Sequence, residues 1–277
     1  MISFTKAHAC GNDFLIVSED SAAGEDHPAL TQRLCNRNTG VGADGIEFFA
    51  WKNQSRLSPR SGRIRLFNAD GSVAEISGNG TRCVAAWMAY TLGAKPGEPL
   101  ELETGAGLRV CCIDSVLADR GFSVDVTTGM GVPRFMPHTL KLIDGVEVVG
   151  VEVTTGNPHF VVLVEDPEFT LARRTWTTLG AEISVHRDFP QHTNVEFVRI
   201  AGDHEIDIRI FERGVGPTFS SGTGSAAAAT AALALRRCTS PIKVVAPGGS
   251  QTVAWDGPGT ELNLTGPAAL IARGEAW

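Results

Sequence analysis

Two glycine-rich loops contain the residue types that could hold an anion and move a proton. Ser-Gly-Asn-Gly at 77–80 and Ser-Gly-Thr-Gly at 221–224 share one pattern, and an apolar run typical of a helix follows each. Glycine lets the backbone approach a ligand closely, and the first turn of a helix offers unpaired N–H groups and the positive end of its dipole. A lone loop of this kind is more often a capped turn. The repetition favours two sites for a carboxylate or a phosphate.

Other side chains near these loops could take part in acid–base chemistry. His159 follows Asn-Pro and precedes an apolar run, while Glu212 and Arg213 interrupt a second apolar run where it enters the second loop. His159 and Glu212 could carry a proton, and Arg213 offers a planar fork for a carboxylate. Each also fits an ordinary role, as a structural histidine or as the solvated end of a strand. Asn68 and Asn194, taken singly, are typical turn residues.

The two loops belong to halves of the chain that match in order and spacing. Gly-Asn stands before a hydrophobic run at Asn12 and again at Asn157. From Asn12 to Ser77 is 65 positions, and from Asn157 to Ser221 is 64. We interpret this register as an internal duplication of one β-rich unit around one buried helix.

Most of the elements that must position these loops are predicted to be strands. Runs rich in β-branched and aromatic residues predict strands at 14–17, 63–67, 108–113, 122–126, 146–153, 159–164 and 205–211. The helices predicted at 81–94 and 224–237 are nearly free of charge, which is typical of helices buried on all sides. We expect two further, amphipathic helices near 29–36 and 171–183.

Composition narrows the class of protein. The 277 residues favour two domains, and a net charge of -7 with scattered basic residues argues against a nucleic-acid partner. The six cysteines lack CxxC spacing, so we expect neither a metal site nor a disulfide framework, and only Cys10 lies in a glycine-containing loop. The N-terminus has no signal-peptide pattern and no run of 18 apolar residues occurs, so we expect a cytoplasmic protein without a membrane partner.

These segments together resemble the diaminopimelate epimerase family of cofactor-independent amino-acid epimerases. The shared motifs, in the family's order, are GNDF, GVGADG, FNADGS, SGNGTRC, GNPH, TNVEF, FERGVG and SGTGSAAAA. The resemblance implies an α+β fold of two pseudo-symmetric domains, each a β-sheet wrapped around a central buried helix. We expect the first domain at 1–116 with 265–277, and the second at 117–264.

The resemblance also implies a role for each motif residue. Ser77 and Ser221 match the two residues that act on opposite faces of the substrate's α-carbon, with His159 and Glu212 as auxiliary acid–base groups. The positions that match substrate contacts are Asn12, Asn68, Gly78, Asn79, Asn157, Asn194, Arg213, Gly222 and Thr223. The implied reaction converts LL-diaminopimelate to its meso form in lysine biosynthesis. It needs no cofactor and no metal, and its partner is a small-molecule amino-acid substrate, diaminopimelate or an analogue.

The chain departs from the family at both loop positions, where the family normally has cysteine. An alkyl hydroxyl is roughly five pKa units less acidic than a thiol, so a serine base is on the order of 7 kcal/mol harder to form. We therefore expect the chain as given to be a weak or inactive epimerase. Two alternatives stay open: a related dehydratase or isomerase of the same fold, and an amino-acid-binding form left by a natural or engineered Cys-to-Ser exchange. A homodimer also stays open.

Overall fold

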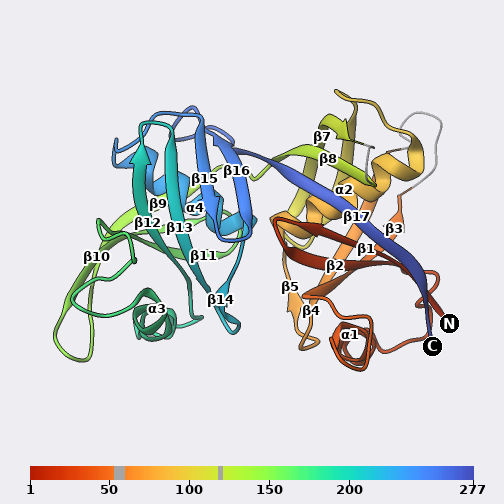
Figure 1. The fold of residues 1–277 in the computed structure, drawn as a ribbon, viewed down its shortest axis with the longest axis horizontal. Helices are drawn as coiled ribbons and strands as arrows, with labels where there is room; N and C mark the ends of the chain where they lie inside the picture. The colour runs from red at the N-terminus through yellow and green to blue at the C-terminus, as the bar shows by residue number, and fades with distance from the viewer. Residues whose placement is uncertain (53–59, 118–120) are drawn as a thin grey trace. The chain divides into compact units, whose positions relative to one another are not determined.

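The chain folds into two units of the same plan, each a β-sheet wrapped around one buried helix (Figure 1). The computed structural model describes residues 1–52, 60–117 and 121–277. The first unit comprises Met1–Gly129 and Thr265–Trp277, and the second comprises Met130–Leu264. The sequence analysis places 117–129 in the second domain, whereas β8 (Phe122–Gly129) lies in the first unit because it pairs with β7 (Gly107–Leu117).

The strands of the first unit form a closed ring. Neighbouring strands, in spatial order, are β17 (Asn263–Ala276), β1 (Ile2–Ala9), β2 (Asn12–Ser18), β3 (Gly45–Trp51), β4 (Ser61–Asn68), β6 (Pro99–Thr104), β7 and β8. β8 pairs in turn with β17, which closes the ring, and the short β5 (Val73–Ala74) pairs antiparallel with the end of β4. Helix α1 (His27–Cys35) packs on β3 and β4.

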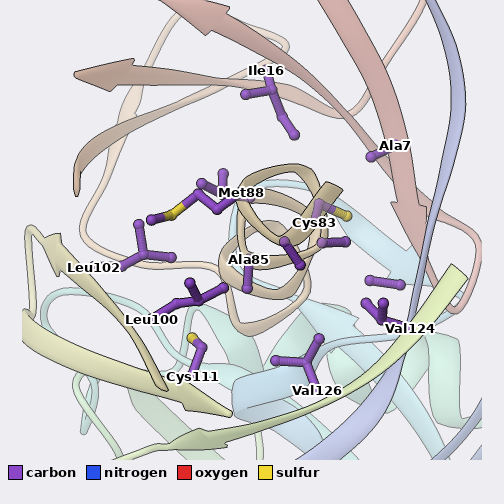
Figure 2. Packing of buried hydrophobic residues seen from close by; sticks show 14 of the residues in the cluster. Ala7, Ile16, Cys83, Ala85, Met88, Leu100, Leu102, Cys111, Val124 and Val126 are labelled. Atoms are coloured by element: carbon purple, nitrogen blue, oxygen red, sulfur yellow. The ribbon is translucent and has the colours of Figure 1, made fainter. Parts of the chain in front are cut away.

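Helix α2 (Gly78–Leu92) fills the interior of this ring because it is apolar on every side. Its buried residues meet strand residues from all directions, among them Ile16, Leu100 and Val126 (Figure 2). The helix ends at Gly93, whose φ of 62° is easily reached by glycine and whose N–H bonds the carbonyl of Ala89. The predicted buried helix at 81–94 is thus present, but it begins three residues earlier, within the glycine-rich loop.

The second unit repeats this arrangement. Its neighbouring strands are β9 (Arg134–Lys141), β10 (Glu147–Thr154), β11 (Pro158–Leu163), β12 (Asn194–Gly202), β13 (Glu205–Glu212), β15 (Ile242–Ala246) and β16 (Gly249–Ala254). The short β14 (Gly216–Thr218) pairs antiparallel with the end of β13, and α3 (Trp176–Ser184) packs on β12 and β13. Helix α4 (Gly222–Ala234) lies against β10 to β13, β15 and β16.

The parallel strand pair in each unit has the same register. In the first unit Phe14 of β2 lies opposite Gly45 of β3, and in the second His159 of β11 lies opposite Asn194 of β12. Two positions further along, Ile16 meets Glu47 and Val161 meets Glu196. The strand after each pair is β4 in the first unit and β13 in the second. The loop that follows it leads to the buried helix, α2 or α4. Within the described residues, no helix is both long and apolar enough to cross a membrane.

Candidate functional site

Ser77 caps helix α2 with its own side chain. Its Oγ accepts the N–H of Gly80 at 3.0 Å, and its carbonyl accepts the N–H of Thr81 at 2.8 Å. An N-cap serine satisfies one of the donors at the start of a helix, while the first helical N–H groups have no acceptor within the helix. Gly78 and Asn79 are therefore part of the helix's first turn, where a carboxylate binds well.

Behind this turn lies a network of buried polar side chains. Asn79 is fully buried, donates through Nδ2 to Oδ1 of Asn12 at 3.1 Å, and accepts from Arg82. Asn12 in turn donates to Asp44 at 2.7 Å. Burial lowers the pKa of the Arg82 guanidinium, and the neighbouring Cys10 opposes that shift. The amides of Asn12 and Asn79 thus bond to each other and fix the loop, which leaves its backbone as the surface for a ligand.

Asn68 lies at the end of β4, four residues from a partner in the turn that follows. Its Nδ2 donates to Ser72 Oγ at 3.0 Å, and Ser72 in turn bonds Asp70. The side chain is half-buried and stands beside the start of the loop that leads to α2. A side-chain amide in this place can also offer its carbonyl oxygen to an ammonium group of a ligand.

Ser221 caps helix α4 in the same way as Ser77 caps α2. Its Oγ accepts the N–H of Gly224 at 3.2 Å, and its carbonyl accepts the N–H of Ser225 at 3.0 Å. Ser221 is buried, with 8% of its surface exposed, whereas Ser77 is half-buried. The N–H groups of Gly222 and Thr223 begin the helix without an acceptor inside it. Both serines therefore stand at the positive end of a buried helix.

A line of polar contacts connects Ser221 to a buried glutamate. Ser221 Oγ lies 3.4 Å from Thr223 Oγ1, which accepts from Nδ2 of Asn157 at 3.3 Å. The Asn157 oxygen lies 2.9 Å from Nε2 of His159, and Nδ1 of His159 lies 2.8 Å from Oε1 of Glu196. Both ring nitrogens of His159 are therefore hydrogen-bonded within its unit, and His159 is connected to Ser221 only through Asn157 and Thr223.

The His159–Glu196 pair is neutral as a whole. Nε2 faces a carbonyl oxygen and so carries a hydrogen, and a second hydrogen lies between Nδ1 and the carboxyl. Whichever atom holds that second hydrogen, the charges of ring and carboxyl cancel. Both side chains are fully buried, and burial raises the pKa of Glu196 although His159 opposes the shift. A proton can therefore move within the pair without leaving a net charge in the interior.

The remaining predicted residues of the second unit lie where β13 ends. Asn194 donates through Nδ2 to the carbonyl of Pro158 at 3.1 Å and accepts the N–H of Arg213 at 2.9 Å. Its amide thus joins β11, β12 and the end of β13, and serves as a structural link. Arg213 is exposed, with one guanidinium N–H donated to the carbonyl of Gln191 at 3.0 Å. Glu212 is half-buried beside it.

Each glycine-rich loop covers a buried carboxyl that sequence reasoning missed. A Cβ added to Gly80 would overlap Oε1 of Glu47, and one added to Gly224 would lie 2.8 Å from Oε1 of Glu196. The second glycine of each loop is therefore needed for close packing over a glutamate, in addition to any approach by a ligand. The available signal was a glutamate inside an apolar run, in GIEFF and again in NVEFV. Within the described residues, no three His, Cys, Asp or Glu side chains group as a metal site requires.

The chain is similar to known proteins over nearly its whole length. The family model of diaminopimelate epimerase matches residues 4–135 and 151–271. The diaminopimelate epimerase of Thermosynechococcus vestitus is 37% identical over 99% of this chain and 98% of its own, and that of Moorella thermoacetica is 34% identical over 98% of each. Among solved structures, a phenazine biosynthesis protein of the PhzF family from Bacillus anthracis has a TM-score of 0.72 at 16% identity, covering 100% of this chain and 99% of its own, which shows a shared fold. The chain belongs to the diaminopimelate epimerase family.

Proposed function

We propose that this chain is a cofactor-independent epimerase that inverts the α-carbon of LL-diaminopimelate to give the meso form, a step of lysine biosynthesis. One observation carries the proposal: in both units a serine caps the N-terminus of a buried helix directly above a buried glutamate. A helix start binds an α-carboxylate, and a side chain at its first turn is placed to exchange a proton with the adjacent carbon. The repeated design also favours an internal duplication.

The proposed reaction divides the proton transfers between the two serine positions. On one face of the substrate the Cα–H bond breaks, its proton moves to a side-chain oxygen that has first lost its own proton to solvent, and the electron pair spreads from the α-carbon into the carboxylate. On the opposite face the other side chain gives its proton to the α-carbon. The N–H groups of the two helix starts stabilise the negative charge that develops on the carboxylate. This mechanism requires Ser77 and Ser221 to act on opposite faces of one α-carbon.

The other motif residues have supporting roles in this proposal. His159, backed by Glu196, orients the amide of Asn157, which donates to Thr223 Oγ1 beside Ser221. Glu212 is a second acid–base group near the end of β13. The exposed guanidinium of Arg213 is suited to hold the distal carboxylate of the substrate. Asn68 and the backbone of the two loops complete the substrate contacts.

The test is α-proton exchange and epimer formation from LL-diaminopimelate in deuterated water, followed by NMR. The parent should exchange slowly, because serine is a poor base, and Ser77→Cys combined with Ser221→Cys should raise turnover by several orders of magnitude, the scale expected from roughly 7 kcal/mol. Each single exchange should restore much less, since inversion needs both faces.

Three other results would contradict the proposal. A new unsaturated product would identify a dehydratase, and tight binding without exchange, even in the double variant, would identify a binding protein. Parent turnover in the ordinary enzyme range, unchanged or lowered by the double exchange, would show that serine itself is the working residue.

A further inference from the structure

Glu47 is a fully buried carboxyl with no assigned role. It lies in the middle of β3 and has no exposed surface. Neither of its oxygens has a hydrogen-bond partner among the residues that the structure describes. An unpaired buried carboxyl costs stability, and an apolar side chain of similar size would fit an interior strand better. Its presence therefore calls for a reason other than folding.

The carboxyl of Glu47 lies under the first turn of α2, at the serine. A Cβ on Gly80 would overlap Oε1 of Glu47 and would lie 3.2 Å from Cβ of Ser77. Glu47 and Ser77 thus approach the same point of this turn from different sides. No side chain stands between them at that point, because residue 80 is glycine. A charge on this carboxyl therefore acts on Ser77 at short range.

The second unit shows what a glutamate in this place does. There, the Cβ position of Gly224 is 2.8 Å from Oε1 of Glu196 and 3.1 Å from Cβ of Ser221. Glu196 is hydrogen-bonded to His159. In the first unit, the strand position that corresponds to His159 is occupied by Phe14. The first unit therefore has the carboxyl without the imidazole.

The surroundings of Glu47 decide when it is charged. The strands β2 and β4 face it with apolar side chains such as Ile16 and Leu66. Among the described residues, the titratable groups that act on this interior are Arg82 and Cys83 of α2, Asp13 of β2, Cys10 and Cys111. Burial raises the pKa of Glu47 to about 8. Burial, and to a lesser degree Glu47 itself, raises the pKa of the Cys83 thiol.

We infer that Glu47 is a positioning residue of the first unit's half-site, whose buried charge sets how tightly the side chain at position 77 holds its proton. When Glu47 is uncharged, the side chain at 77 releases its proton more readily, and when Glu47 ionises, the proton is held more tightly. The inference rests on the proposed function only in treating position 77 as a proton-transfer position.

The experiment measures the proton affinity at position 77 directly. The thiol of the Ser77→Cys variant is alkylated with iodoacetamide from pH 5 to pH 10, and the labelled peptide is separated from those of the native cysteines by mass spectrometry. The same profile is measured with Glu47→Gln added. Removing the carboxyl should move the pH profile of the alkylation rate to lower pH. At a pH on the rising part of the profile, the rate should increase by up to about tenfold. The thiol of Ser221→Cys, with and without Glu47→Gln, is the matched control and should not change.

Turnover provides the second readout. Glu47→Gln in the background of Ser77→Cys with Ser221→Cys should change the pH profile of kcat near pH 8 and leave KM nearly unchanged, which a merely structural role would not do. An unshifted thiol profile in a folded Glu47→Gln protein would overturn the inference, and Glu47→Met replaces Glu47→Gln if the latter does not fold. A shifted thiol profile in a protein that never exchanges the α-proton would reject the proposed function and leave the role of Glu47 intact.

Discussion

At the scale of single residues, the second unit contains a buried histidine–glutamate pair whose charges cancel. His159 and Glu196 are both buried, and each would be costly to charge alone. Together they hold one mobile proton, and Asn157 and Thr223 connect them to Ser221. Glu196 therefore matters for the position of the proton, because it fixes which ring nitrogen of His159 faces Asn157.

Glu196→Gln should impair proton transfer without unfolding the protein. The amide keeps the shape of the side chain but cannot balance a charge on His159, so the hydrogen bonds that orient Asn157 and Thr223 beside Ser221 are weakened. We expect kcat to fall at least about a hundredfold in the Ser77→Cys, Ser221→Cys background, with a smaller change in KM. Glu152→Gln is the matched control, since Glu152 also contacts a histidine, Nδ1 of His138 at 2.7 Å, but at the surface. Equal losses in both variants would remove the special role of Glu196.

The raised pKa of Glu47 should make the free energy of unfolding depend on pH. Its pKa is about 8 in the folded chain and near the ordinary 4.5 when unfolded, so both forms are protonated below about pH 4.5. Between pH 4.5 and pH 8 the unfolded chain loses this proton while the folded chain keeps it, so the stability contribution falls as pH rises, by a total on the order of 5 kcal/mol. Above pH 8 the contribution is constant.

Denaturant unfolding of the parent and of Glu47→Met, measured between pH 4 and pH 9, checks this sign. The variant should become increasingly more stable than the parent from pH 4.5 to pH 8, and Glu47→Gln should follow the same trend. A stability difference that stays constant over this range would show that Glu47 does not titrate as described.

At the scale of elements, the glycine-rich loop is the first turn of a helix packed over a carboxyl. Both Gly80 and Gly224 lie at the point where a glutamate from the neighbouring strand meets the helix. An alanine at an ordinary helical position stabilises by up to about 1 kcal/mol relative to glycine. Here, the missing Cβ makes room for the carboxyl, so the usual preference is reversed.

Gly80→Ala should destabilise the protein by about 1 to 3 kcal/mol, because its Cβ overlaps Oε1 of Glu47. Adding Glu47→Ala should recover most of the loss, which makes the two changes strongly non-additive in a double-mutant cycle of unfolding free energies. Gly202→Ala is the control, since a Cβ there meets nothing within 4 Å. Additive effects of the first pair would mean that the carboxyl does not occupy this space.

Sequence patterns predicted both buried helices and the strands with long apolar runs, but not β1, β3, β6, β9, β12, β15 or β16. Runs at 63–67 and 205–211 became β4 and β13, and both buried helices were found, because their apolar residues are continuous. Strand β17 was missed, since Gly266 and Pro267 interrupt its pattern. Helix α3 begins at Trp176 and not at 171, because Thr175 caps it.

The candidate site was predictable only in part. The loops and the motif residues follow from the sequence, because they recur in register. The pairing of His159 with Glu196 does not, since it depends on which residues of two different strands become neighbours. For the same reason, the position of Glu47 under Gly80 emerges only when β3 and α2 are packed together.

At the scale of the whole molecule, each unit has its own hydrophobic interior. The clusters around α2 and α1 contain only residues of the first unit, and those around α4 and α3 contain only residues of the second. The second unit is continuous in sequence, whereas the first is completed by the C-terminal strand. The first unit therefore depends on a segment that follows the whole second unit in the sequence.

Removal of residues 265–277 should unfold the first unit selectively. The segment supplies most of β17, which pairs with β1 on one side and β8 on the other, and Ala268 packs in the cluster around α2. Without it both neighbours lose backbone partners and the ring opens, so amide hydrogen exchange should become fast in β1, β8 and α2. Amides of β12, β13 and α4 should stay protected, because their core contains no residue of this segment. Ile271→Ser, at an exposed position of the same strand, should leave both units protected. Loss of protection to the same degree in both units would instead mean that they fold as a single cooperative body.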